Sequence, residues 1–230
     1  INKLKKEDLY DDSYIFFYSD HGGPFPRHKR AIYETGTKVP FLVKFPGGKN
    51  EKVNNKQLLS FIDLAPTVLS IAGLKSPSEY QGFAFLGKNK SKIEREFLYT
   101  SSDRFDNVPD RIRAVRDSKF KYIRNYNPEN SHALNVLYRK QMLLMRHLTS
   151  LHLTGQLDEK SDNWFKSPRL MEELYDLEND PFELTNLSLD PNYTDIKKKL
   201  SLNLDEFLLK IDDLGRIPEE ELIKLISSED

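Results

Sequence analysis

The feature that most constrains the fold is a pair of apolar runs joined by a short polar loop near the start of the chain. Residues 14–19, YIFFYS, are apolar and aromatic almost throughout, and residues 39–45, VPFLVKF, form a second run. A continuous apolar run of this length is typical of a strand covered on both faces. Residues 63–73, DLAPTVLSIAG, begin at an Asp and end at a Gly, and their apolar spacing predicts a short helix. Strand, loop, strand and helix in this order favour part of an α/β sheet domain.

The sequence pattern changes at about residue 93. The segments EFLYTSS, IRAVRDS and FKYIRNY predict short strands, and the last two are expected to form a hairpin. Residues 133–153 are expected to be helical, and residues 193–214 carry apolar side chains at the spacing of an amphipathic helix. We therefore expect residues 1–92 to belong to an α/β sheet domain. Residues 93–230 are expected to form a small α+β subdomain with an antiparallel sheet and a packed C-terminal helix.

The composition excludes several classes of function. The 230 residues include 35 Lys and Arg and 36 Asp and Glu, so the formal net charge is −1 and no global field favours nucleic acid or an anionic membrane. The chain has no cysteine, which excludes disulfides, thiolate metal sites and a cysteine nucleophile within it. No apolar run approaches the roughly 20 residues that span a bilayer. Any function that depends on charge must be local, and we expect neither a nucleic-acid nor a membrane partner.

Residues that bind cations and anions follow the first predicted strand. Asp20 and His21 come at its end, where ligands bind in open α/β sheets. A carboxylate there suits Ca²⁺ or Mg²⁺, and His21 could add a nitrogen ligand or hydrogen-bond to a bound anion. Further along the loop, Lys29 can contact a phosphate or sulfate oxygen. A divalent cation with a Lys describes a site for a tetrahedral anion. Taken singly, each feature has a simpler explanation, a plain turn and a solvated basic loop.

The order of these residues resembles a known family. The segments Ser19-Asp20-His21-Gly22, PFPRHK and YETGTKVPFLVKFPG closely resemble the sulfatase family of the alkaline-phosphatase-like superfamily. LLSFIDLAPTVLSIAGL resembles a helix of that family, and RAVRDSKFKYIRNY and ELYDLENDPFELTNL resemble the hairpin and closing strand of its C-terminal subdomain. The spacing in PFPRHK is closest to heparan N-sulfatase-like and related bacterial glycan sulfatases.

The resemblance implies a fold and a set of site residues. Residues 1–92 would be the C-terminal part of the α/β sulfatase catalytic domain, followed by the family's C-terminal α+β subdomain. Asp20 and His21 would belong to the Ca²⁺ shell, in which Mg²⁺ is the alternative ion, and many relatives have Asn at the position of His21. Lys29 would be the catalytic residue that contacts the substrate sulfate, and His28 is a further candidate for substrate binding.

The nucleophile of the family is absent from this sequence. Sulfatases use a formylglycine made from Cys or Ser in a C/S-x-P-x-R motif, and its hydrate attacks sulfur. The match NVPDR has Asn107 at that position, and an amide cannot serve. The resemblance therefore implies a C-terminal portion of a sulfatase, whose missing N-terminal half supplies the formylglycine. We expect this chain to be inactive alone. The whole enzyme is expected to be periplasmic or secreted and to remove sulfate from a sulfated sugar or glycan.

Several residues outside the loop have two interpretations. Asp103 and Arg104 are candidates for substrate binding, because this part of the small subdomain leans over the pocket in relatives, and a salt-bridge cluster in a loop is the alternative. Trp164 could stack on a sugar ring or anchor its loop. Glu34 and Gly36 are expected to be structural. Three arginines that alternate along the predicted strands are expected to face solvent: Arg113, Arg116 and Arg124.

Two alternative functions remain open, and a structural subdomain with no ligand is a third possibility. One keeps the fold and changes the chemistry to that of a phosphodiesterase or phosphonate hydrolase of the same superfamily, which often uses two transition metals and needs additional His and Asp ligands. The other is a non-catalytic module that binds sulfated glycans, having kept Lys29 and lost the nucleophile.

Overall fold

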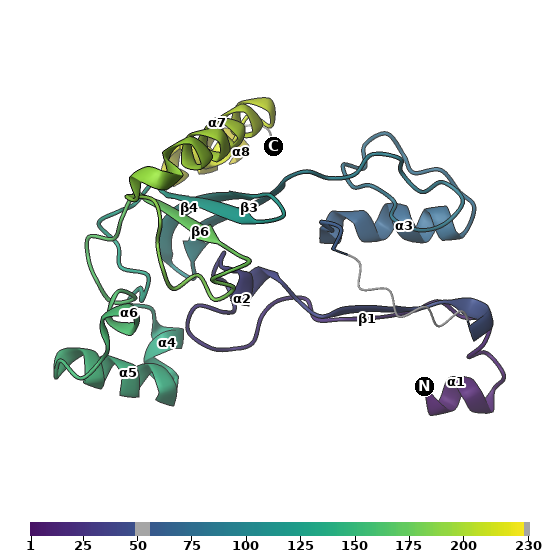
Figure 1. The fold of residues 1–230 in the computed structure, drawn as a ribbon, viewed down its shortest axis with the longest axis horizontal. Coiled ribbons are helices and arrows are strands. Elements are labelled where there is room, and N and C mark those ends of the chain that lie inside the picture. Colours follow the sequence, from purple (N-terminus) through teal and green to yellow (C-terminus); the bar gives the residue numbers. More distant parts are fainter. Residues whose placement is uncertain (49–55, 228–230) are drawn as a thin grey trace.

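The computed structural model describes residues 1–48 and 56–227, and the strands in these ranges form two antiparallel sheets. Figure 1 shows a two-stranded ribbon, β1–β2, that extends away from a four-stranded sheet of order β3-β4-β5-β6. The expected fold class, an α/β portion followed by an α+β portion with an antiparallel sheet, is confirmed. The strands are β1 (Ile15–Tyr18), β2 (Phe41–Lys44), β3 (Leu98–Phe105), β4 (Val108–Arg116), β5 (Phe120–Asn125) and β6 (Glu172–Asp176).

Short helices connect the strands, and a long helix follows the last one. The helices expected over residues 63–73 and 193–214 are confirmed as α3 and α7. The helix expected over residues 133–153 is divided into α4 and α5, because Met142 between them has an extended backbone with φ −74° and ψ 121°. No helix in the described ranges is long and apolar enough to cross a bilayer. The helices are α1 (Asn2–Lys6), α2 (Glu34–Thr37), α3 (Leu64–Ile71), α4 (Leu137–Gln141), α5 (Leu143–Leu153), α6 (Glu159–Asp162), α7 (Thr194–Lys210) and α8 (Glu219–Ser227), with 3-10 turns η1 (Pro46–Gly48), η2 (Phe61–Asp63), η3 (Pro191–Tyr193) and η4 (Leu214–Arg216).

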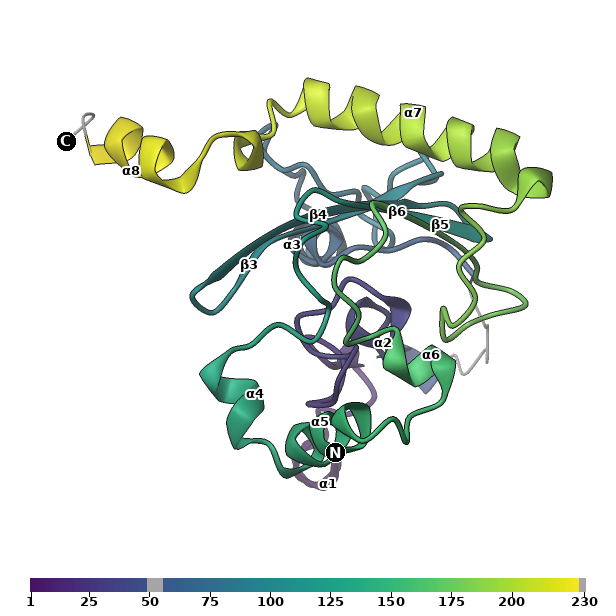
Figure 2. The ribbon, with the colours of Figure 1, turned by 90° about the vertical axis from the view of Figure 1, so that its left-hand side faces the viewer.

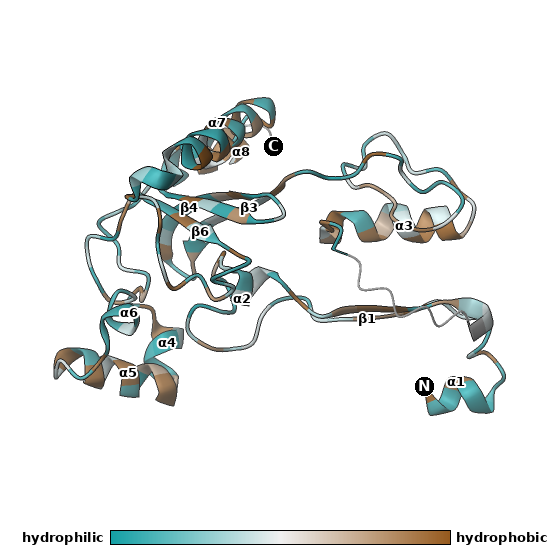
Figure 3. Ribbon diagram, viewed as in Figure 1, coloured by the Kyte–Doolittle hydropathy of each residue, from teal (hydrophilic) through white to brown (hydrophobic). Residues whose placement is uncertain are grey.

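The β1–β2 ribbon is packed on one of its faces. Tyr18 stacks on Phe41 of the paired strand at a ring-centroid distance of 5.7 Å and contacts Phe61 at 5.6 Å. Phe17, which points to the opposite face, is 64% exposed. Figure 3 shows the ribbon as one of the hydrophobic parts of the fold. The expectation that β1 is covered on both faces is therefore wrong for the described residues, because the face that carries Phe17 is largely exposed.

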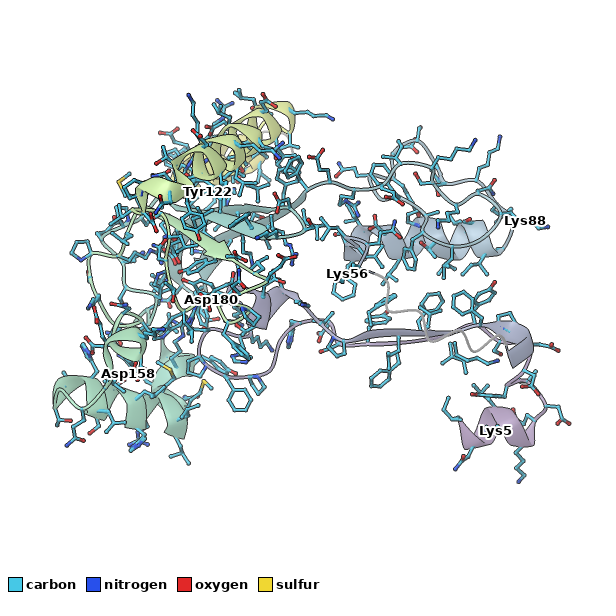
Figure 4. All side chains as sticks on the ribbon, in the orientation of Figure 1. Lys5, Lys56, Lys88, Tyr122, Asp158 and Asp180 are labelled. Atoms are coloured by element: carbon cyan, nitrogen blue, oxygen red, sulfur yellow. The ribbon has the colours of Figure 1, made fainter. Side chains whose placement is uncertain are left out.

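The four-stranded sheet has a packed layer on each face. Figure 2 shows α7 running across one face, and Figure 4 places Tyr122 of β5 between the sheet and this helix. The expected packed C-terminal helix is therefore confirmed. Five side chains in this layer are no more than 1% exposed: Val115, Tyr122, Leu174, Leu200 and Leu204.

The opposite face of the sheet holds the end of the loop that follows β1. Ile32 and Tyr33 of this loop pack in one cluster with Ile123 of β5. Trp164 belongs to the same cluster and is 8% exposed. It therefore anchors its own loop in the core and does not present its ring to solvent.

The charged segment over residues 101–113 is a β-hairpin and not a loop. β3 continues to Phe105, β4 begins at Val108, and Asp106 makes the turn between them with φ 51°. The expected hairpin of the next two strands is confirmed, with Ala114 of β4 opposite Ile123 of β5.

The three strand arginines expected to face solvent are paired with carboxylates, so this expectation is wrong. Their side chains are 4%, 15% and 20% exposed in chain order. The alternation of residue types along a strand shows which side chains share a face. It does not show whether that face is exposed to solvent or covered by acidic residues that are distant in the sequence. The pairs are Arg113 with Asp213, Arg116 with Glu34 and Arg124 with Asp205.

Candidate active-site loop

Backbone contacts close the loop between β1 and β2 against α2. The N–H of Gly22 donates to the carbonyl oxygen of Gly36 at 2.9 Å, and the N–H of Lys29 donates to that of Gly23 at 3.0 Å. A Cβ atom at Gly22 would lie 1.9 Å from the carbonyl oxygen of Thr35, so no larger residue fits there. This close approach fixes the backbone that carries the polar residues of the loop.

Asp20 and His21 lie side by side directly after β1. Oδ2 of Asp20 is 3.5 Å from Nε2 of His21, and the two side chains are 81% and 39% exposed. Nδ1 of His21 is 2.7 Å from the carbonyl oxygen of Gly22. Because a carbonyl oxygen can only accept, Nδ1 carries a proton, and a neutral ring then presents the Nε2 lone pair to the carboxylate. A cation placed between these two atoms could accept a lone pair from each of them.

Asp20 and His21 do not by themselves make up a complete metal site. A carboxylate oxygen is the kind of ligand that Ca²⁺ prefers, but Ca²⁺ takes about six to eight ligands. Over residues 1–48 and 56–227, no group of three or more His, Asp or Glu side chains could hold a metal ion. The donor chemistry of Asp20 and His21 therefore fits two positions of a coordination shell.

His28 and Lys29 have different surroundings. Nδ1 of His28 lies 2.9 Å from the carbonyl oxygen of Pro26, and its ring meets the edge of the Phe25 ring at 5.6 Å. Lys29 lines a small hollow beside Phe25. Within the described part of the chain, no carboxylate lies within ion-pair distance of the Lys29 ammonium. The orientation of His28 is set by local contacts, whereas the charge of Lys29 is available to an anion.

Asp103 and Arg104 both form ion pairs within the second half of the chain. Oδ1 of Asp103 accepts a hydrogen bond from Arg113 at 2.6 Å, and Nη2 of Arg104 lies 2.9 Å from a carboxylate oxygen of Glu219. In the described ranges, no hydrogen bond or ion pair joins either residue to residues 20–29. Both side chains therefore form salt bridges, as the alternative interpretation of this segment expected. Their contact with a substrate stays a prediction.

Glu34 is a buried anchor for the loop, in keeping with the structural role expected for it. Its carboxylate lies 2.5 Å from Nη1 of Arg116 and 3.1 Å from Nζ of Lys121, which is also 3.2 Å from the Glu183 carboxylate. Burial alone would raise the pKa of Glu34, but the charges of Lys121 and Arg116 outweigh burial and lower it. Burial raises the pKa of Glu183. The Tyr-Glu-x-Gly segment is thereby fixed to the four-stranded sheet.

A buried hydrogen-bond cluster beside the loop has no signal in the sequence. The Glu173 carboxylate accepts hydrogen bonds from Tyr33 at 2.8 Å, Tyr175 at 2.6 Å and Asn125 at 2.7 Å. Burial would raise the pKa of Glu173, but the nearby His132 and then these three donors outweigh burial and lower the pKa. Burial and the Glu173 charge raise the pKa of Tyr33 well above its ordinary value. Tyr33 and Glu173 are 140 residues apart, and strand alternation does not identify partners at that separation.

Comparison with known proteins identifies the class to which this fold and loop belong. A family described as "N-sulphoglucosamine sulphohydrolase, C-terminal" matches residues 23–144. An ulvan-active sulfatase of Formosa agariphila is 46% identical over 224 residues, which are 97% of this chain and 37% of the relative. An endo-4-O-sulfatase of Bacteroides thetaiotaomicron is 30% identical over 222 residues, 93% of this chain and 38% of the relative. The solved structure of a 2-O GAG sulfatase has a TM-score of 0.65 at 23% identity, over 93% of this chain and 41% of that one.

The fold is that of the C-terminal portion of a sulfatase. The family match covers more than half of the 230 residues, and the chain belongs to the N-sulphoglucosamine sulphohydrolase C-terminal family. The chain spans 37% and 38% of the length of the two curated relatives.

Proposed function

We propose that the protein carrying this chain is a sulfatase that hydrolyses sulfate esters on a sulfated sugar or glycan. The observation that carries the proposal is the closed loop after β1. It holds Asp20 and His21 with their donor atoms 3.5 Å apart, and then Lys29, whose ammonium has no carboxylate partner among the described residues. A cation-binding pair and an unpaired ammonium on one loop suit a sulfate group.

Each loop residue has a defined part in this reaction. Asp20 and His21 would hold Ca²⁺, with Mg²⁺ as the alternative, and the bound ion supplies positive charge to the sulfate oxygens. Lys29 donates a hydrogen bond to a sulfate oxygen and stabilises the negative charge that develops there. His28 contacts the substrate beside Lys29. The nucleophile, a formylglycine, is supplied by the N-terminal half of the protein, since this sequence has neither a Cys nor an S-x-P-x-R motif.

The substrate is a sulfated glycan, and ulvan is the first candidate because the relative at 46% identity is an ulvan-active sulfatase. Asp103 and Arg104 are proposed to contact the sugar next to the reacting sulfate, by exchanging one of their present ion-pair partners for substrate. We infer a periplasmic or secreted enzyme from the resemblance to glycan sulfatases. Residues 1–92 would then form part of the catalytic domain and residues 93–230 the C-terminal subdomain.

The proposal is tested by measuring sulfate release by the full-length protein from ulvan and from 4-nitrocatechol sulfate. We expect turnover that is lost on chelation and restored by Ca²⁺. Lys29→Met should lower kcat by roughly 100- to 1,000-fold, as removal of one charge-stabilising donor does. Lys38→Met is the matched control, because Lys38 is exposed at the end of α2, and it should leave kcat unchanged.

Two results would contradict the proposal. One is faster hydrolysis of a phosphonate monoester or phosphodiester than of any sulfate ester, which would favour the phosphonate hydrolase alternative. The other is tight binding of sulfated glycan without sulfate release, which would favour a non-catalytic binding module.

A further inference from the structure

One buried arginine has no acidic partner among the described residues. Three arginines are buried in the described structure, Arg113, Arg139 and Arg169. Arg113 pairs with Asp213, and Arg169 donates two hydrogen bonds to the carboxylate of Asp110. Within the described ranges, Arg139 has no carboxylate within ion-pair distance, although it is only 8% exposed. Buried charges in proteins are usually paired or bind a ligand. The guanidinium of Arg139 therefore calls for a counter-ion that the described residues do not supply.

The guanidinium of Arg139 is held in a fixed orientation. Nη1 donates to the carbonyl oxygen of His132 at 2.7 Å, and the carbon of the guanidinium lies 4.1 Å from the Phe105 ring centre and 5.3 Å from that of Trp164. Burial lowers the pKa of Arg139 to about 10, so the group stays charged at neutral pH. Within residues 1–48 and 56–227, its guanidinium donates one hydrogen bond, to the His132 carbonyl, although it carries five N–H groups.

Arg139 and Lys29 line the same hollow. The loop after β1 contributes Phe25 and Lys29, and α4 contributes Tyr138 and Arg139. Phe25 is 55% exposed and Tyr138 is 40% exposed, so two aromatic rings reach the surface beside the two cations. The hollow has a volume of about 10 Å³, so it has room for at most one oxygen atom of an anion.

We propose that Lys29 and Arg139 together bind one anionic group of the substrate, a sulfate or a carboxylate on the sugar. The chemical identity of that substrate rests on the proposed function, whereas the anion site itself rests on two unpaired cations that line one hollow. Arg139 supplies a forked donor to the oxygen atoms, and Lys29 supplies a point charge. Arg139 is then a specificity residue contributed by the second half of the chain.

The site is tested by isothermal titration of the full-length protein with sodium sulfate and with sodium acetate. Arg139→Met should weaken sulfate binding by about 10- to 100-fold, as loss of charge-assisted hydrogen bonds does. Arg139→Lys should weaken it less, because it retains the charge and loses the fork. Arg146→Met, on exposed α5, is the matched control and should bind as the wild type does. A response to acetate identifies carboxylate as the group bound, and a response to sulfate alone identifies sulfate.

A double-mutant cycle distinguishes one shared anion from two separate ones. If Lys29 and Arg139 hold the same anion, the losses in Lys29→Met and Arg139→Met should not add in the double variant. Additive losses would overturn the shared site, and so would wild-type affinity in Arg139→Met. If circular dichroism shows that Arg139→Met is unfolded, the sulfate affinity of Arg139→Lys is the measurement that tests the site. Failure of the protein to release sulfate from any ester would overturn the proposed function and leave an Arg139-dependent anion site standing.

Discussion

Replacing Lys121 with Met removes the positive charge that two buried carboxylates share. The Lys121 ammonium is 3.1 Å from Glu34 and 3.2 Å from Glu183, and the three side chains are 1%, 7% and 0% exposed. At an effective dielectric constant of about 20, each attraction is worth about 5 kcal/mol, and the cost of burying the charges offsets much of this. Removing one partner of such a buried group typically costs about 3–5 kcal/mol. For a full-length protein of roughly 600 residues, the length that the relative at 46% identity implies, we therefore expect Lys121→Met to lower the melting temperature by about 2–4 °C.

The loss should depend on pH in a defined direction. Burial already raises the pKa of Glu183 in the folded protein, and without Lys121 the carboxyl group must take up a proton to stay buried. A folded-state pKa above the unfolded value gives stability that is complete below the unfolded pKa and decreases as the pH rises toward the folded pKa. Lys121→Met should therefore be less destabilising at pH 5 than at pH 8, with a slope of at most about 1.4 kcal/mol per pH unit.

Differential scanning calorimetry of the full-length protein measures both effects. The matched control is Lys119→Met, because Lys119 is 42% exposed and its ammonium lies 3.4 Å from Glu178 and 3.7 Å from Asp176, and ion pairs of such an exposed Lys are worth about 0–1 kcal/mol. The reasoning would be refuted if Lys121→Met lowered the melting temperature no more than Lys119→Met does.

Two further substitutions test the loop and its buried support. Gly22→Ala should destabilise the protein by about 1–3 kcal/mol, because the new Cβ would meet the backbone oxygen of Thr35 at 1.9 Å, whereas Gly23→Ala meets only the movable Phe25 ring at 3.2 Å. Thermal melts of both variants check this, and equal losses would contradict it. Tyr33→Phe should cost about 1.5–3 kcal/mol by removing a hydrogen bond to the ionised Glu173. Because the pKa of Glu173 is lowered on folding, its stabilisation is lost as the pH falls, and Tyr33→Phe should weaken that acid dependence. Unfolding curves between pH 4 and pH 7 that are parallel to the wild type would count against this role.

Local patterns in the sequence predicted most of the helices and strands, and they pointed to the candidate residues of the loop after β1. The apolar runs at β1 and β2, the 3.6-residue period of α7 and the hairpin of β4 and β5 depend on neighbours in the chain, so sequence reasoning reached them. The exposure of Phe17 was not predicted, because an apolar run indicates that a strand prefers burial and not which segments cover it.

The ion pairs and the anion hollow could not be predicted from local patterns. Arg116 and Glu34 are 82 residues apart, and nothing near either residue marks the other as its partner. In the sequence, nothing distinguishes Arg139 from the other residues of a predicted helix. Its burial and its missing carboxylate become visible once α4 is placed beside the loop that carries Lys29. The spacing of residues in the sequence determines on which face of a helix or strand a side chain lies. The tertiary fold determines which residues pack against that face.

The most direct measurement is a crystal structure of the full-length protein grown with Ca²⁺ and sulfate. We expect a calcium ion about 2.3–2.6 Å from a carboxylate oxygen of Asp20, with His21 beside it, and a sulfate oxygen within about 3.2 Å of the Lys29 ammonium. Calcium bound away from Asp20, or a sulfate ion held without Lys29, would contradict the assignment of this loop as the sulfate-binding edge of the active site.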